Sequence, residues 1–299
     1  MDVSIIIVNY NTRDLTVNCI NSIIENTKNI AFEIILVDNA SSDGSPKEIK
    51  DLFTDIVLIE SDKNVGFGRA NNLAAAIAKG EFVFFLNSDT ILIENSVKKL
   101  YDFFIANESR LNIGVLGSVL VDAHLNTNGY GAHFPNAKEE RLKNLSRIPF
   151  FKFFLKLPKK QVYPLQENYF EIDYVIGADM FMKASLFKRL DGFAPDFFMY
   201  YEESDLQKRI SNLGLKQYII TDTKIIHLED GSGKIIRKYS NRKRIIVHQS
   251  RIIYLKRNEP REFRKFVMVD FLFTGLGLFN FKYSFKENLT YLRNVIKTY

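Results

Sequence analysis

The amino-acid sequence predicts an α/β fold in which helices cover both faces of a mostly parallel β-sheet. Short, continuous runs of β-branched and aromatic residues recur through the first 90 residues, which is typical of strands buried on both faces. Segments with apolar residues at helical spacing separate these runs, and short polar turns end them. Strands and helices that alternate with short loops favour a parallel, doubly wound sheet.

The order of the predicted elements is strand, helix, strand, helix, strand, helix, strand. The four strands are expected at 3–8, 32–37, 56–60 and 82–86, and the three helices at 15–24, 47–53 and 66–78. The pattern is less regular further on. Strands are expected at 113–121, 169–182, 217–220 and 224–226, and helices at 185–190 and 205–213.

The 299 residues are enough for one large α/β domain with an appendage. We assign residues 1–235 to the α/β domain, with a basic, aromatic insertion at 136–168. Residues 236–299 are predicted to form a basic, mainly helical tail that is rich in Phe. Residues 1–130 contain 10 Lys and Arg against 17 acids, whereas the remainder contains 31 against 18. This division predicts two surfaces with different partners.

The basic second half could contact nucleic acid, an anionic lipid surface or a phosphorylated substrate. No nucleic-acid-binding module is present, and the sheet domain is acidic, so we expect no nucleic acid as a partner. Basic helices with aromatic residues suit an anionic membrane surface, although a solvated basic face over a second core explains the same pattern. A single cysteine, Cys19, and an N-terminus without a basic signal-peptide region favour a cytoplasmic location, with the chain lying peripherally on the inner face of the membrane.

Polar residues follow three of the predicted strands, at 9–12, 38–45 and 87–90. Ligands of doubly wound sheets bind at the carboxyl ends of the strands. Asp38 could accept a hydrogen bond from a ribose hydroxyl or a base, and Asp89 could hold a divalent cation bridged to a diphosphate. Asp and Asn also fill turns and cap helices, which is the alternative for either acid. No G-x-G-x-x-G follows the first strand, so a Rossmann dinucleotide site is weakly supported.

A second acidic group lies at the start of the helix expected at 205–213. Glu202, Glu203 and Asp205 follow the aromatic run FFMYY. Acids at a helix N-terminus are often only caps. Three acids beside an aromatic run also suit a general base, since inverting sugar transfer requires a carboxylate to accept the proton of the attacking hydroxyl.

Seven segments occur in an order that resembles glycosyltransferase family 2, and more narrowly its rhamnosyltransferase-like branch. They are VSIIIVNYNT, ILVDNASSDGS, NVGFGRANN, FLNSDT, GADMFMK, DGFAPDFFMYYEESDLQKR and IIHLEDGSG, and they cover roughly residues 2–235. The resemblance implies a GT-A fold, a nucleoside diphosphate sugar donor, a divalent metal (Mg²⁺ or Mn²⁺) and inversion at the anomeric carbon.

The resemblance also implies roles for individual residues. Tyr10 matches the residue that packs on the donor base, and Asp38 the one that hydrogen-bonds it. Asn64, Gly66 and Asn71 fall in the donor-binding segment. Asp89 matches the metal-binding acid of the D-x-D element, and His227 falls where the family often has a histidine near metal and diphosphate. Glu203 matches the catalytic base.

Two positions depart from the family pattern. Asn87 stands where D-x-D has its first acid, and Glu203 stands where the base is usually Asp. Asp205 is therefore the alternative base. The resemblance predicts a hexosyltransferase that moves rhamnose from dTDP-rhamnose to a growing, lipid-linked cell-surface polysaccharide. A UDP-sugar donor is the closest alternative, and a catalytically dead nucleotide-sugar-binding protein is another.

Overall fold

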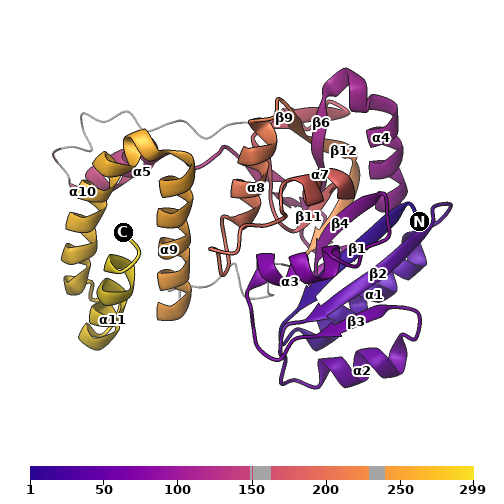
Figure 1. Cartoon of the computed structure of the whole chain (residues 1–299), viewed down its shortest axis with the longest axis horizontal. Helices are drawn as coiled ribbons and strands as arrows, with labels where there is room; N and C mark the ends of the chain where they lie inside the picture. Colours follow the sequence, from indigo (N-terminus) through magenta and orange to yellow (C-terminus); the bar gives the residue numbers. More distant parts are fainter. Residues whose placement is uncertain (149, 151–162, 229–239) are drawn as a thin grey trace. The chain divides into compact units, whose positions relative to one another are not determined.

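The computed structural model describes residues 1–148, 150, 163–228 and 240–299, which fall into two compact units (Figure 1). Unit 1 contains residues 1–133, 163–195 and 203–228. Unit 2 contains the described residues of 134–150 together with 196–202 and 240–299. The predicted boundary between residues 235 and 236 lies outside the described residues.

Unit 1 is built on one large mixed sheet whose strands run in the order β3-β2-β1-β4-β11-β6-β12-β5. The half formed by β3, β2, β1 and β4 is parallel, so these four strands end at one edge. The strands are β1 (Val3–Asn9), β2 (Phe32–Asp38), β3 (Val57–Glu60), β4 (Phe82–Asn87), β5 (Thr90–Leu92), β6 (Ile113–Val121), β7 (Thr127–Gly129), β9 (Tyr169–Ile172), β11 (Asp179–Lys183) and β12 (Lys216–His227). A separate ribbon pairs β8 (Gly131–Ala132) with β10 (Tyr174–Val175).

Helices cover both faces of this sheet because its strands are apolar on both sides. In β1, Ile5 and Ile7 pack into one core, whereas Ile6 packs into the other. The first core receives α1 (Arg13–Asn26), α2 (Ser45–Leu52) and α4 (Ser96–Leu111); the second receives α3 (Phe67–Ala75), α7 (Ala184–Arg189) and α8 (Glu202–Ser211). The predicted α/β fold is confirmed, with the parallel half of the sheet formed by β3, β2, β1 and β4.

Three elements differ from the sequence-based expectation. No helix is predicted at the position of α4, although its buried apolar residues, Val97, Leu100 and Phe104, stand at helical spacing. The strand expected at 169–182 is divided into β9, β10 and β11. The strands expected at 217–220 and 224–226 form one strand, β12, whose pairing with β6 shifts register between Ile220 and Lys224.

Unit 2 is helical, as predicted for the tail, and also includes a helix from the predicted insertion. Figure 1 shows α5 (Ala137–Leu145), α9 (Asn241–Asn258), α10 (Pro260–Leu276) and α11 (Phe285–Ile296) lying together, with the short 3₁₀ helix η2 (Gly277–Phe279) after α10. Polar caps fix the helix starts. Asn136 accepts from the backbone of α5, and Ser284 forms a capping box with Glu287 at α11. None of the described helices combines the length and the apolar character that crossing a membrane requires.

A buried carboxylate joins the helices of unit 2. Asp270 of α10 accepts hydrogen bonds from His248 Nε2 (2.6 Å) and from the hydroxyl of Tyr299 (2.6 Å). Asn144 of α5 donates to it at 2.8 Å, and Arg251 of α9 lies 3.3 Å away. Burial by itself raises the pKa of Asp270, but these donors outweigh burial and lower its pKa to about 2. Asp270 therefore helps to hold the predicted insertion against the predicted tail, together with the pairs of Arg251 with Glu140 and of Arg141 with Glu262.

The segment that precedes α8 also belongs to unit 2. The hydroxyl of Ser250 on α9 donates to the carbonyl of Met199 at 2.8 Å, and Arg257 pairs with Asp196 at 2.8 Å. Tyr200 and Tyr201 have φ angles of 71° and 70°. Two successive non-glycine residues in the left-handed region are unusual, and such strain gathers at functional sites.

Candidate active site

The carboxyl ends of β1 and β2 carry a pair of hydrogen-bonded polar side chains. Asn9 and Asp38 are register partners, and Asn9 Nδ2 donates to Asp38 Oδ1 at 2.7 Å. The second carboxyl oxygen accepts from the backbone N–H of Ser41 at 2.9 Å. Asp38 is only 2% exposed. Asp38, which is predicted to bind the nucleotide of the sugar donor, is thus fixed in orientation at the edge of the sheet. Asn9, to which the sequence patterns assign no role, helps to fix it.

The loop before α3 is attached to the end of β2. Asn39 Oδ1 accepts from the N–H of Val65 at 2.9 Å, and Asn39 Nδ2 donates to Asn64 Oδ1 at 3.1 Å. Asn64 Oδ1 also accepts from the N–H of Gly66 at 3.0 Å. Gly66 has a φ of 91°, a conformation that glycine adopts without steric cost. Asn64 and Gly66, two of the residues predicted to bind the sugar donor, therefore shape this loop.

Asn71 and Tyr10 occupy opposite environments. Asn71 is 1% exposed, and its Nδ2 donates to the carbonyl of Phe67 one turn earlier in α3. Tyr10 follows β1 and is 42% exposed, so its ring is available to a ligand at the strand ends.

The turn after β4 presents Asp89 beside His227. Asp89 Oδ1 lies 3.3 Å from His227 Nε2, and the two side chains are 13% and 12% exposed. The backbone reinforces the contact, because His227 is the register partner of Thr90 and Leu228 donates to the carbonyl of Asp89. The carbonyl of Asn87 accepts from the hydroxyl of Thr90 at 2.7 Å, which closes the turn. Residues 138 positions apart in the chain therefore meet at one place, as the predicted metal site requires.

The donor set at this place suits a partly protein-bound divalent cation. Asp89 offers a carboxylate oxygen and His227 an imidazole nitrogen. The described residues contain no group of three or more His, Cys, Asp and Glu that could hold a metal. Mg²⁺ and related cations are commonly bound by one or two protein groups, with substrate phosphates and water as the other ligands.

A buried aspartate lies on the strand next to β4. Asp179 of β11 is fully buried, and its Oδ2 accepts from both the N–H and the hydroxyl of Ser118 at 2.6 Å. Oδ1 has no hydrogen-bond partner among the described residues. Burial raises the pKa of Asp179 to about 7, although Ser118 opposes the change.

Glu203 lies near the start of α3, which follows the loop of Asn64 and Gly66. A Cβ placed on Gly177 would lie 3.7 Å from Glu203 Cβ and 3.6 Å from Cε1 of Phe67, the first residue of α3. Glu203 and Phe67 therefore both lie near Gly177. Neither Phe67 nor Gly177 has a role among the sequence-predicted residues, although both lie in motifs that carry the resemblance.

Asp205 has a different environment from Glu203. It is 1% exposed, and its Oδ2 lies 3.0 Å from Nε of Arg209. Arg209 in turn donates to the carbonyls of Leu190 and Gly192, at 2.6 and 2.8 Å. Asp205 thus takes part in an internal ion pair that joins α8 to the end of α7.

Contacts connect the predicted residues along the edge of the sheet. The hydroxyl of Thr12 donates to Asn9 Oδ1 at 2.8 Å and lies 3.0 Å from the hydroxyl of Ser88, which links Asp38 to the turn of Asp89. In the other direction, Asn39 joins the end of β2 to the loop of Gly66, and Phe67 leads on to Gly177 and Glu203. The structure therefore brings Asp38 and Asp89, from the strand ends, and Glu203, from the second acidic group, to one side of unit 1.

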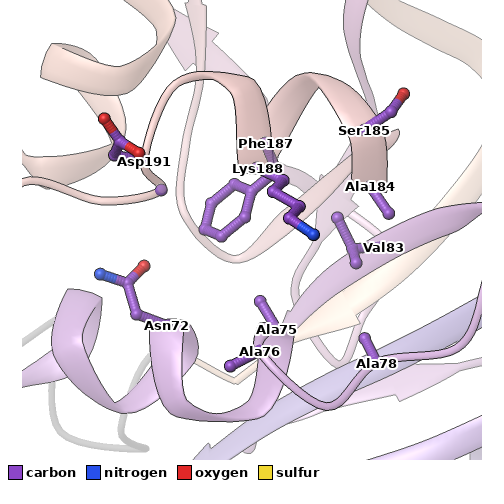
Figure 2. A pocket seen from close by; sticks show the side chains of 11 residues that line it. Asn72, Ala75, Ala76, Ala78, Val83, Ala184, Ser185, Phe187, Lys188 and Asp191 are labelled. Carbon is purple, nitrogen blue, oxygen red and sulfur yellow. The ribbon is translucent and has the colours of Figure 1, made fainter.

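A cavity of about 490 Å³ lies elsewhere in unit 1, near the start of β4. Figure 2 shows alanines of α3 and its continuation on one side and Phe187 and Lys188 of α7 on the other, with the Lys188 amine directed toward Val83. Its lining is mostly apolar and contains none of the predicted site residues. We therefore place the candidate active site at the strand ends.

Comparison with known proteins gives a family match over the first part of the chain. Residues 4–172 match the model of the family described as glycosyl transferase family 2. A poly(ribitol-phosphate) beta-glucosyltransferase of Bacillus spizizenii is 34% identical over 124 residues, which are 40% of this chain and 20% of that protein. An N-acetylglucosaminyl-diphospho-decaprenol L-rhamnosyltransferase of Mycobacterium tuberculosis is 22% identical over 210 residues, 65% of this chain and 66% of the other.

The fold is also similar to that of a solved glycosyltransferase. The mannosyltransferase PcManGT from Pyrobaculum calidifontis, in complex with GDP-Man and Mn²⁺, superposes with a TM-score of 0.55 at 16% identity. The alignment covers 99% of this chain and 73% of that one, so the likeness concerns the GT-A-like fold. The family model covers more than half of the chain, in the segments that form the strand ends. The chain therefore belongs to glycosyl transferase family 2.

Proposed function

We propose that this protein is an inverting glycosyltransferase that moves a hexose from a nucleoside diphosphate sugar to a hydroxyl of a growing cell-surface polysaccharide. The observation that carries the proposal is the gathering of these side chains at the strand ends. Asp89 lies against His227, the neighbouring Ser88 is linked through Thr12 and Asn9 to Asp38, and Phe67 and Glu203 both lie near Gly177. A nucleoside diphosphate sugar needs adjacent binding places for its nucleotide, its diphosphate and its sugar.

The donor nucleotide would lie along β1 and β2. Asp38 keeps lone pairs for a base N–H, since Asn9 and Ser41 each supply one donor to it. The exposed ring of Tyr10 would pack on the base. Asn64 and Gly66 would shape the loop around the donor, with Asn71 supporting the first turn of α3, and Asn87 would face the diphosphate.

Asp89 and His227 would hold a divalent cation, Mg²⁺ or Mn²⁺. When bound, the cation neutralises charge on the diphosphate leaving group. The 3.3 Å approach of an oxygen and a nitrogen ligand supports this assignment. Asn87 is a neutral neighbour, so Asp89 would supply the negative charge on this turn.

Glu203 would act as the general base. Its carboxylate accepts the proton of the acceptor hydroxyl while that oxygen attacks the anomeric carbon. A new C–O bond forms as the bond from the anomeric carbon to the diphosphate oxygen breaks on the opposite face, so the configuration inverts. Glu203 suits this role better than Asp205, whose carboxylate is buried against Arg209. A base requires access to the acceptor.

The sugar and the acceptor follow from the resemblance to relatives. The mycobacterial relative acts, by its name, on a diphospho-decaprenol with L-rhamnose, which supports dTDP-rhamnose as the donor and a lipid-linked acceptor. A UDP-sugar is the second candidate, because the Bacillus relative is named a glucosyltransferase. We place the protein in the cytoplasm, peripherally on the inner face of the membrane.

Donor binding and its dependence on metal test the proposal. We would screen dTDP-rhamnose, UDP-glucose and UDP-N-acetylglucosamine by thermal shift with and without Mn²⁺, and then measure turnover of the best donor. Asp89→Asn should abolish turnover and the Mn²⁺-dependent part of the affinity, because it removes the carboxylate ligand. The matched control is Asp102→Asn, which removes an exposed carboxylate that pairs with Lys98 on α4. Unchanged Mn²⁺-dependent affinity in Asp89→Asn would contradict the metal site. Tight donor binding without product or hydrolysis would favour the catalytically dead protein.

A further inference from the structure

One face of α10 exposes large apolar side chains. Met268, Phe271, Leu272 and Leu276 are 76%, 51%, 56% and 53% exposed, and the stripe continues to Phe279 of η2 at 72%. Their spacing of three, four and eight residues places them on one side of a helix. The opposite side carries the residues that α10 buries, which are Phe266, Asp270 and Thr274. The helix therefore has an interior side inside unit 2 and a second apolar side without a covering element among the described residues.

The turn after α10 and the start of α11 also expose large apolar side chains. Phe281 is fully exposed and Phe285, at the start of α11, is 67% exposed. We name the surface the apolar face; its residues are Met268, Phe271, Leu272, Leu276, Phe279, Phe281 and Phe285. Single exposed apolar residues are ordinary, but seven large ones between residues 268 and 285 are typical of an interaction site.

Basic residues surround the apolar face. Residues 260–299 contain seven Lys and Arg and three acids. Asp270 is buried, Glu287 forms the cap of α11, and Glu262 pairs with Lys265 and Arg141. Two exposed lysines, at 282 and 286, directly follow Phe281 and Phe285, and Arg261, Arg264 and Lys265 are exposed at the start of α10. The rim is therefore positive.

We propose that the apolar face inserts into the headgroup region of an anionic phospholipid bilayer. Apolar side chains enter the boundary of the acyl chains, while Lys and Arg on the rim contact anionic headgroups. A second copy of this chain fits less well, because a two-fold contact would place the same basic rim against itself. The biological purpose rests on the proposed lipid-linked acceptor, whereas the surface and its charge are independent of it.

Vesicle flotation of the full chain tests this assignment. We expect the protein to float with vesicles of phosphatidylglycerol and phosphatidylcholine at low salt, and to float poorly with phosphatidylcholine alone. Lys282→Gln with Lys286→Gln should weaken binding by about 30-fold, since each surface lysine contributes about fivefold. Phe279→Ala, Phe281→Ala and Phe285→Ala together should weaken it further, and the loss should persist at higher salt. These side chains are exposed, so the fold should survive.

The matched control is Leu52→Ala with Ile105→Ala, two apolar residues that are 54% and 50% exposed on unit 1. This control should float like the wild type. Flotation of the aromatic variant at the wild-type level, or equal flotation of the wild type with neutral vesicles, would overturn the proposal. The proposal would also be overturned if the wild type did not float and instead sedimented as a dimer, while the aromatic variant sedimented as a monomer. Calorimetry of UDP and dTDP with Mn²⁺ on the same variants should show unchanged affinity. Loss of flotation with intact nucleotide binding separates this inference from the proposed function.

Discussion

The two units differ in where they place polar and apolar side chains. Unit 1 fills both faces of its sheet with apolar residues and gathers polar residues such as Asn9, Asp38 and Asp89 at the ends of strands. Unit 2 buries Asp270 and His248 at the centre of its helices and exposes Phe279 and Phe281. The first arrangement suits a site that binds polar ligands, and the second suits a surface that contacts an apolar phase.

Two buried aspartates show the same contrast in their electrostatics. Asp270 of unit 2 receives hydrogen bonds from His248, Tyr299 and Asn144, and its pKa falls to about 2. Asp179 of unit 1 is bonded only to Ser118 among the described residues, and burial raises its pKa to about 7. Hydrogen bonds from His248 and Tyr299 and the charges of His248 and Arg251 therefore favour the charged form of Asp270, whereas burial outweighs Ser118 at Asp179.

The largest expected effect concerns the base in unit 1. Glu203→Gln retains size and hydrogen bonding but does not accept a proton, so kcat should fall by about 10²–10⁴-fold. Donor affinity should barely change, because Asp38 and Asp89 are intact. Glu203→Asp should retain more activity than Glu203→Gln. Initial rates at saturating donor provide the measurement.

Asp205→Asn is the comparison for this prediction. It breaks a buried pair with Arg209 and should cost about 3 kcal/mol of the free energy of unfolding, with a smaller loss of kcat. If Asp205→Asn shows the deeper loss of kcat in folded protein, Asp205 is the base.

The next effect concerns the centre of unit 2. Asp270→Asn should reduce the stability of α9, α10 and α11 by about 3 kcal/mol, because His248 and Arg251 lose a buried anionic partner. Hydrogen exchange should show faster exchange in these helices and in α5, with β1 to β4 unchanged. Asp102→Asn, which removes an exposed pair, should cost less than about 1 kcal/mol. Unchanged protection of α10 would mean that packing alone holds the helices together.

The smallest effect concerns Asp179 and depends on pH. Because its folded pKa of about 7 exceeds the ordinary value of 3.8, the folded state holds the proton more tightly. The wild type therefore loses stability as pH rises from about 4 through 7, and the cost is fully present above 7. Asp179→Asn should raise Tm relative to the wild type by a few °C more at pH 8 than at pH 5. An equal difference at both pH values would show that Asp179 remains ionised in the fold.

The sequence by itself determined the parallel half of the sheet and the residues at its edge. Continuous apolar runs such as that of β1 specify strands buried on both faces, and the residue after each run must lie at a strand end. Asp38 and Asp89 are therefore at the predicted edge. The motifs that resemble the family also indicated the membership that the family model confirms, because they keep both residue type and order.

Only the tertiary structure decided which distant residues meet. The pairing of Asp89 with His227 depends on the antiparallel contact of β5 with β12, and no local periodicity encodes that contact. The position of Glu203 and Phe67 near Gly177 likewise depends on the packing of α8 and α3 beside the segment that leads into β11. In unit 2, the side of α10 that stays exposed is set by the position of Asp270 among the other helices. Local spacing specifies which residues share a face, whereas long-range packing specifies what that face contacts.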